Sequence, residues 1–369
     1  MSRPAAPSPS TSGSDPADPG TRRRPGWMWG LRVFASAALA VALLAVALPR
    51  VTGARWSQIA VVLGRLGPAE VGALTAAWLA GLWCYSFVLT GTVPGLTRAQ
   101  AVAVNVTGSA VSNLLPFGGA AGLATTFAML RSWGVPSATI GLSALVTGVA
   151  NVVAKLALPL AGLVALLVVG DAATGRLAVA AAVAAASLAV TLGLLGGAVA
   201  SERFAVALGR RAQAAATAVL ALLRVRRDLR WDAGVLRWRH QVIGVVRDGW
   251  AAIALGLVGF LGAQALLLHL SLHLLGSRLG PAQVFAGYAF GRLLSTLVIT
   301  PGGLGITETG VAGLLVAFGG DPSVCTSGVL LFSGFAFFAE FPAGAVGYAV
   351  WVTRRSWRRP VSHDRVPLP

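Results

Sequence analysis

The chain has 369 residues, of which 56% are hydrophobic and 11% charged, and its formal net charge is +17. A soluble globular domain carries about 25% charged residues, so this composition excludes a soluble enzyme and favours an integral membrane protein. The basic residues lie between and beyond the apolar segments, which favours an explanation by membrane topology over nucleic-acid binding.

The N-terminal part of the chain changes from polar to apolar within a few residues. Residues 1–26 are rich in Pro, Ser, Gly and Asp, which predicts a disordered cytoplasmic tail. A first, uncleaved span is expected over 27–48. Residues 50–68 mix Arg and Trp with aliphatic residues, which is typical of a helix at the membrane interface, although a loop would also fit. A second span is expected over 69–89.

Two segments are predicted to be broken or re-entrant hairpins. The first, over 96–133, is an apolar helix dotted with Asn and Ser, then the break Pro116-Phe117-Gly118-Gly119, then a short helix. The second, over 282–318, has the break Pro301-Gly302-Gly303-Leu304-Gly305. We count neither of them as a full crossing.

Four further full spans complete a predicted total of six, and they cover residues 137–170, 177–199, 250–275 and 324–351. The span over 137–170 would be about 51 Å long as one helix. This length exceeds one straight crossing, so a kink or break is expected near Lys155 to Pro159. Residues 200–249 form an Arg-rich linker and residues 354–369 a basic tail. The fold class is therefore an all-α polytopic membrane bundle.

The charge pattern predicts the orientation. The Arg22 to Arg24 cluster, the 200–249 linker and the 354–369 tail should all be cytoplasmic because Lys and Arg concentrate on that side. Six crossings place all three on one side, with both termini inside. The Arg residues between the first two spans then fall outside, against the rule.

The two membrane halves, 27–199 and 250–353, resemble each other. Pro116 matches Pro301, Gly118 matches Gly303 and Lys155 matches Glu340 at one spacing, although Gly and Pro are abundant enough for chance to remain the alternative. Both halves contain a span, a broken hairpin and a kinked span. The predicted orientation inverts one half relative to the other, which is a transporter arrangement.

The two breaks are the first candidate site. Irregular backbone cannot face lipid, so the breaks should line a cavity or pack in protein. A helix that begins after a break points its N–H groups at that cavity, which suits a lipid phosphate. The alternative is that the glycines only form tight turns at the membrane edge. The break residues that we expect to contact substrate are Pro116, Gly118, Gly119, Pro301, Gly302, Gly303 and Gly305.

Charged residues inside the apolar stretches are the second candidate site, because each needs a partner or water there. Arg292 is expected to pair with Glu308 or to bind a phosphate, and both belong to the predicted substrate site. Lys155, the only lysine, is expected to pair with Glu340 across the interface between the halves and to gate together with Asn151.

We expect no metal or other cofactor. His269 and His273 are one helical turn apart, but no third ligand is evident. Cys84 and Cys325 each lie in an apolar segment and are expected to be buried thiols.

The strings Leu115-Pro116-Phe117-Gly118-Gly119, Met129 to Gly134 and Pro301 to Glu308 together resemble the lysylphosphatidylglycerol synthase transmembrane family. The resemblance covers most of residues 27–351 and implies a bacterial inner-membrane bundle with inverted repeats. For its best-studied relatives it implies movement of aminoacylated phosphatidylglycerol between leaflets. Members often have an Arg shortly before a Pro in the last span, where this chain has Phe335. The chain ends at Pro369, so any synthase activity is expected to reside elsewhere.

The leading interpretation is a flippase-like transporter, and not an enzyme, that moves an anionic, aminoacylated or polyprenyl-phosphate-linked lipid head group across the membrane. The alternative is a non-transporting scaffold or regulator of an envelope lipid or glycan enzyme, with the Arg-rich linker as its docking surface. The partners expected are membrane lipids and not nucleic acid. A lipid-modifying enzyme, a glycosyltransferase and a second copy of the chain are further candidates.

Overall fold

A computed structural model describes residues 34, 38–114, 118–170, 175–222, 235–296, 300 and 303–358. Several sequence predictions fall outside these ranges. They concern the 1–26 tail, the end of the basic tail, and the break residues Pro116, Pro301 and Gly302.

The described residues form helices and no strands, which confirms an all-α membrane bundle. Five helical segments are long and apolar enough to cross a membrane, and a sixth is added if one bent pair counts as a span. The five cover Pro68–Thr92, Ser137–Val169, Ala182–Ala200, Arg239–Leu274 and Pro322–Thr353. The predicted second to sixth spans are therefore all present.

The bent pair occupies the region of the predicted first span and interface helix. The helix over Ala38–Thr52, which contains the π-helical turn η1 (Leu43–Ala47) and α2 (Leu48–Thr52), meets α3 (Trp56–Leu63) at 93°. Gly53, with φ of 77°, ends α2 in the left-handed conformation that glycine adopts readily. The chain therefore turns sharply before α4 (Pro68–Thr92) begins.

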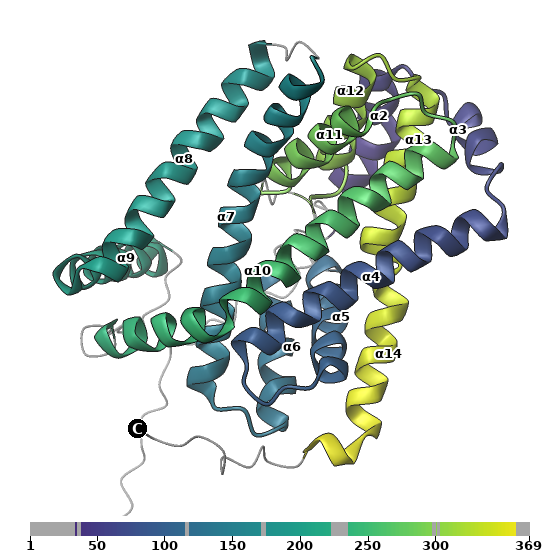
Figure 1. Ribbon diagram of the computed structural model, residues 1–369. Coiled ribbons are helices and arrows are strands. Elements are labelled where there is room, and N and C mark those ends of the chain that lie inside the picture. The colour runs from purple at the N-terminus through teal and green to yellow at the C-terminus, as the bar shows by residue number, and fades with distance from the viewer. Residues whose placement is uncertain are drawn as a thin grey trace, which may run out of the picture.

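Both predicted hairpins are present. In the first half, α5 (Arg98–Leu114) is followed by α6 (Gly119–Ser132); in the second half, α11 (Pro281–Leu294) is followed by α12 (Ile306–Ala317). In Figure 1 the α5–α6 hairpin lies at the lower end of the bundle and the α11–α12 hairpin at the upper end. The two hairpins thus open towards opposite ends.

The helix after each hairpin differs between the halves. In the first half α7 (Ser137–Val169) is one continuous helix that contains Pro159, so of the predicted kink or break the break is not formed, and the kink stays a prediction. Membrane helices tolerate such a proline where neighbouring groups satisfy the carbonyl that it leaves without a partner. In the second half α13 (Pro322–Ser333) passes through the π-helical turn η3 (Gly334–Phe338) into α14 (Glu340–Thr353). The local irregularity is therefore in the second half.

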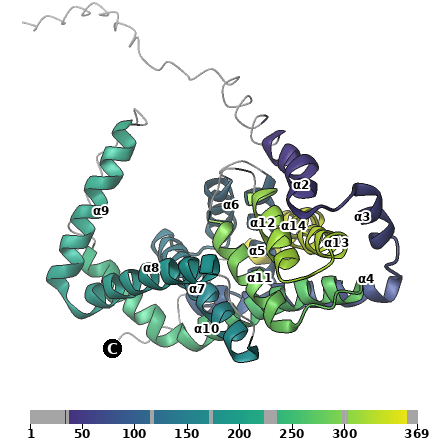
Figure 2. The same ribbon diagram turned by 90° about the horizontal axis from the view of Figure 1, so that it is seen from above.

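The region between the halves is more helical than expected. After α8 (Gly175–Ala200), which is the predicted span over 177–199, this region contains α9 (Glu202–Leu222), and α10 (Val235–Leu274) begins well before residue 250. The last part of the predicted linker is therefore the start of a membrane helix. Seen from above in Figure 2, α9 extends away from the bundle.

The halves pack through corresponding helices. α4 packs on its counterpart α10, and the helix after each hairpin packs on the hairpin of the other half: α7 on α11, and α14 on α5. The last two contacts are equivalent, because α11 corresponds to α5 and α14 to the later part of α7. Gly81 lies against Ala263, and Gly91 against Gly249, so α4 and α10 run antiparallel. Antiparallel partners and opposed hairpins show that the halves are inverted relative to each other.

The residue spacing between the hairpins supports this relation. Gly108 of α5 faces Gly122 and Thr126 of α6, whereas Gly291 of α11 faces Thr307 and Val311 of α12. Thr307 and Val311 follow Gly122 and Thr126 by 185 residues, the spacing that separates Pro116 from Pro301. Matching positions of α6 and α12 thus close both hairpins, against glycines of α5 and α11 that are 183 residues apart and allow close helix contact.

Candidate functional site

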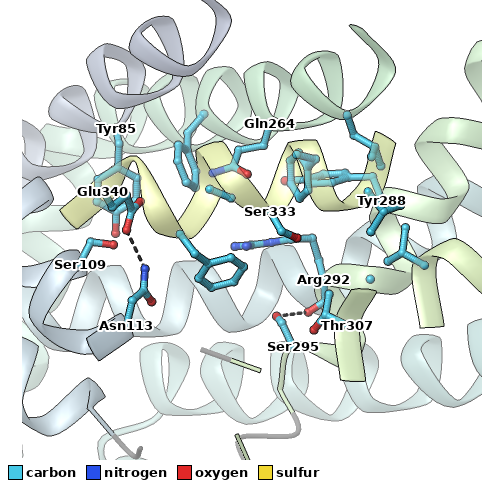
Figure 3. Close-up of a pocket in the computed structure, with 18 of the residues that line it drawn as sticks. Tyr85, Ser109, Asn113, Gln264, Tyr288, Arg292, Ser295, Thr307, Ser333 and Glu340 are labelled. Carbon is cyan, nitrogen blue, oxygen red and sulfur yellow. Dashed lines mark hydrogen bonds between the residues drawn. The ribbon is translucent and has the colours of Figure 1, made fainter. Parts of the chain in front are cut away.

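A polar cavity of about 250 Å³ lies where the two halves meet. Its walls come from α4, α5 and α7 of the first half and from α10, α11, α12, α13, η3 and α14 of the second. Figure 3 shows the labelled side chains converging on it from several helices. Inside a membrane bundle, such convergence of polar groups marks a functional site.

Arg292 of α11 reaches into this cavity from one end (Figure 3). Among the described residues its Nε has no hydrogen-bond partner, and no carboxylate lies within 4.0 Å of its guanidinium. The prediction of a pair with Glu308 is therefore wrong. An uncompensated guanidinium in a membrane cavity is suited to a carboxylate or phosphate that enters from outside the protein.

Glu340, the first residue of α14, lies at the other end of the cavity. Its Oε2 accepts a hydrogen bond of 2.8 Å from Nδ2 of Asn113, and the side chain of Ser109 lies beside its carboxylate (Figure 3). Asn113 and Ser109 belong to α5 of the first half. Glu340 thus joins the two halves at the cavity wall.

The predicted ion pair between Lys155 and Glu340 is not formed. In the described part of the chain, the ion pairs are those of Glu202 with Arg239 and His240. Lys155 does not line the cavity either. Residues at matching positions of two inverted repeats need not face each other, and here the partner of Glu340 is an amide.

Asn151 of α7 does line the cavity. Its Nδ2 donates to the Thr147 carbonyl at 2.8 Å and lies 3.4 Å from the Tyr85 hydroxyl on α4. It therefore holds the first and last membrane helices of the first half together beside the site. A gating role for Asn151 stays a prediction.

Glu308 does not line the cavity, but it hydrogen-bonds groups of the helices that form its wall. It is fully buried, and its carboxylate accepts hydrogen bonds from the Gly305 amide at the start of α12 and from the Ser333 hydroxyl on α13. Gly305 has φ of 87°, a conformation that favours glycine. Because the carboxylate caps α12, this helix end is already occupied by an anion of the protein itself.

The described glycines of the two breaks, Gly118, Gly119, Gly303 and Gly305, do not line the cavity. Its walls are helix faces next to the breaks, with Thr307 and Ser295 as neighbours of the second break. The prediction that the glycines themselves contact a ligand is therefore not supported at these four positions. Gly303 and Gly305 have positive φ values of 77° and 87°, so they serve the turn that leads into α12.

A second polar cavity of about 250 Å³ adjoins the first. The two share Tyr85, Asn105 and Ser109, and the second extends between α5, α6 and α7 past Ser112 and Thr126. A polar path therefore continues from the site towards the end of the bundle that carries the first hairpin.

Several lining residues were not predicted as site residues. Asn105, Ser109 and Asn113 recur every fourth residue along α5, and this spacing places them on one helix face. This spacing is the sequence pattern that could have identified these three residues as site residues. Tyr85, Gln264 and Tyr288 are single polar groups in apolar helices, and the sequence carries no comparable signal for them.

His269 and His273 stack with ring centroids 6.0 Å apart on α10. In the described residues no group of three or more His, Cys, Asp or Glu side chains could hold a metal ion.

These features define an all-α polytopic membrane protein of two inverted halves around a polar cavity. Residues 33–344 match the family described as the lysylphosphatidylglycerol synthase TM region, and the chain belongs to this family. A search of curated proteins finds no match for it.

Proposed function

We propose that the protein moves a lipid head group that carries a phosphate, as an anionic, aminoacylated or polyprenyl-phosphate-linked lipid does, across a bacterial inner membrane. Both termini would be cytoplasmic. The role is transport and not catalysis. The family concerns the membrane region of a lipid enzyme, which supports a lipid as the transported molecule.

The observation that carries the proposal is the guanidinium of Arg292 in a cavity shared by both halves, without a carboxylate partner among the described residues. A guanidinium binds phosphate by paired, charge-assisted hydrogen bonds that are stronger in a site with little water. The anion would bind at the Arg292 end of the cavity.

The amide and hydroxyl groups of α5 supply the second requirement. A head group needs hydrogen-bond partners in place of water while it is inside the bundle. Asn105 and Ser109 line both polar cavities, and they would provide such partners along the path. Opening and closing at the contact between Glu340 and Asn113 would then control access between the halves.

A proteoliposome assay with fluorescent phosphatidylglycerol tests the proposal, with leaflet exchange measured by quenching from outside. We expect exchange with the native chain and a loss of at least tenfold with Arg292→Ala. Arg292→Lys should keep part of the rate, because the positive charge remains while the paired N–H donors of the guanidinium are lost.

Arg247→Ala is the matched control, since Arg247 is an exposed arginine of α10 outside the cavity. It should exchange lipid at the native rate. Equal rates for Arg292→Ala and the native chain, or no acceleration by any folded variant, would refute transport. The second result would favour the scaffold interpretation, in which α9 extends from the bundle as a docking element (Figure 2).

A further inference from the structure

An apolar groove of about 760 Å³ runs along the outside of the bundle, separate from the polar cavity. It lies between α4, α5 and the α13–α14 segment, and it is lined by aliphatic and aromatic side chains such as Leu79, Val102, Phe335 and Val346. Its volume is within the range of about 300 to 1,000 Å³ that is typical of ligand sites. A large apolar recess on the outer surface of a membrane bundle faces lipid.

The length of the groove matches one leaflet. Along α14 its lining extends from Pro342 to Arg354, which is twelve residues later. At 1.5 Å per residue this is about 18 Å, close to half of a hydrocarbon core of about 30 Å. The groove is therefore long enough for the acyl chain of a lipid in a single leaflet.

One end of the groove carries positive charge. Helices α5 and α14 run antiparallel, with Ala103 beside Gly347 and Ala110 beside Gly344, so the start of α5 lies near the end of α14. Arg354 lines the groove there, and Arg98 directly precedes the lining residue Ala99.

Neither arginine is neutralised by the described residues. No carboxylate lies within 4.0 Å of either guanidinium, and Nη1 of Arg98 is buried without a hydrogen-bond partner. Arg98 stacks on Phe87 and Trp83, and Arg354 on Trp357. Stacking fixes these cations at the end of the groove, where tryptophan is also typical of the membrane interface.

We infer that this groove is a binding site for one anionic phospholipid, whose acyl chain lies along α4 and α14 and whose phosphate contacts Arg354 and Arg98. The site is distinct from the head-group cavity and does not depend on the proposed transport. Phe335 lines the groove, whereas its neighbours Ala336 and Phe337 line the cavity. The bound lipid would therefore lie directly beside the wall of the cavity.

Native mass spectrometry of the full chain, released from micelles with phosphatidylglycerol or phosphatidylcholine, tests the site. In the Arg292→Ala variant, whose head-group cavity lacks its phosphate contact, we expect one retained phosphatidylglycerol and at least fivefold lower retention of phosphatidylcholine. Adding Val346→Trp to this variant should fill the groove and abolish the remaining retention. Val258→Trp is the matched control, because Val258 is similarly exposed, at 69% against 63%, but lies on α10 outside the groove.

The charge is tested separately. Arg354→Gln should reduce the preference for phosphatidylglycerol, while Arg247→Gln should leave it unchanged. Arg292→Ala should keep the retained lipid, which separates this site from the transport cavity. Equal retention by Val346→Trp and Val258→Trp, or loss of the lipid in Arg292→Ala alone, would overturn the assignment. A misfolded Val346→Trp would be recognised by thermal unfolding, and Ala343→Phe would then replace it in the groove.

Discussion

Both charged side chains of the polar cavity come from the second half of the molecule, whereas the polar side chains of the first half that line it are amides and hydroxyls. Asn105, Ser109 and Asn113 come from α5, while Arg292 and Glu340 come from α11 and α14. The two hairpins nevertheless close on matching positions of α6 and α12. The two repeats therefore share the arrangement of their helices, but they differ in the side chains that they present to the cavity.

Matching positions illustrate this division. The residue 185 positions before Glu308 is Leu123, which is half exposed and lines the second cavity, whereas Glu308 is fully buried. The residue 185 positions before Arg292 is Thr107, which hydrogen-bonds the Gly344 carbonyl at 3.4 Å. These charged residues of one half thus correspond to uncharged residues of the other.

The largest expected contrast is between Glu308→Ala and Leu123→Ala. Removing the Glu308 carboxylate leaves the Gly305 amide and the Ser333 hydroxyl without an acceptor, which should lower the unfolding free energy by about 2 to 5 kcal/mol. Leu123→Ala should change it by less than about 1 kcal/mol. Reversible unfolding in mixed micelles measures both. Equal effects would show that the halves do not differ at this position.

A smaller contrast is expected between Gly347→Ala and Gly162→Ala, which are equivalent positions on α14 and α7. A Cβ on Gly347 would lie 2.6 Å from the Thr107 hydroxyl and 2.9 Å from a Val106 methyl, whereas on Gly162 its nearest neighbour is 3.1 Å away. Overpacking at Gly347 should therefore cost about 1 to 3 kcal/mol, and Gly162→Ala should cost less. The same unfolding experiment measures both variants. A larger loss of unfolding free energy for Gly162→Ala than for Gly347→Ala would contradict the packing described.

The smallest effect concerns the contact between the halves. A double-mutant cycle of Asn113→Ala and Glu340→Ala should give a coupling of about 0.6 to 1.7 kcal/mol, the size of interhelical hydrogen bonds in membranes. The parallel cycle of Lys155→Ala and Glu340→Ala should give none. Coupling in the second cycle and not in the first would indicate an ion pair between Lys155 and Glu340, which contradicts the structure.

Much of the fold follows from hydropathy and from proline and glycine. The apolar runs predicted five of the membrane helices, and the two Pro-Gly breaks predicted the hairpins. Pro159 left a kink and a break open as alternatives, because a proline in an apolar helix is compatible with both a break and a continuous helix. The packing of α7 against α11 at Gly162 is a tertiary contact, which the local sequence around Pro159 does not contain.

The site was less predictable than the fold. Arg292 and Glu340 were found because charges inside apolar segments are costly and therefore conspicuous. Their partners depend on the rotation of each helix about its axis, which cannot be read from a helix that is apolar all round. For this reason Lys155 was paired with Glu340, and Asn113 was not recognised as the partner.

Direct binding to the native chain tests the central claim, that Arg292 holds a lipid phosphate in the cavity between the halves. Short-chain phosphatidylglycerol can be titrated calorimetrically into the protein in nanodiscs of zwitterionic lipid, with Arg292→Ala and Arg354→Gln as variants. Losing a charge-assisted contact of about 1.5 to 3 kcal/mol should weaken binding at the cavity at least tenfold in Arg292→Ala, and Arg354→Gln should retain it. Unchanged affinity in Arg292→Ala would contradict the account.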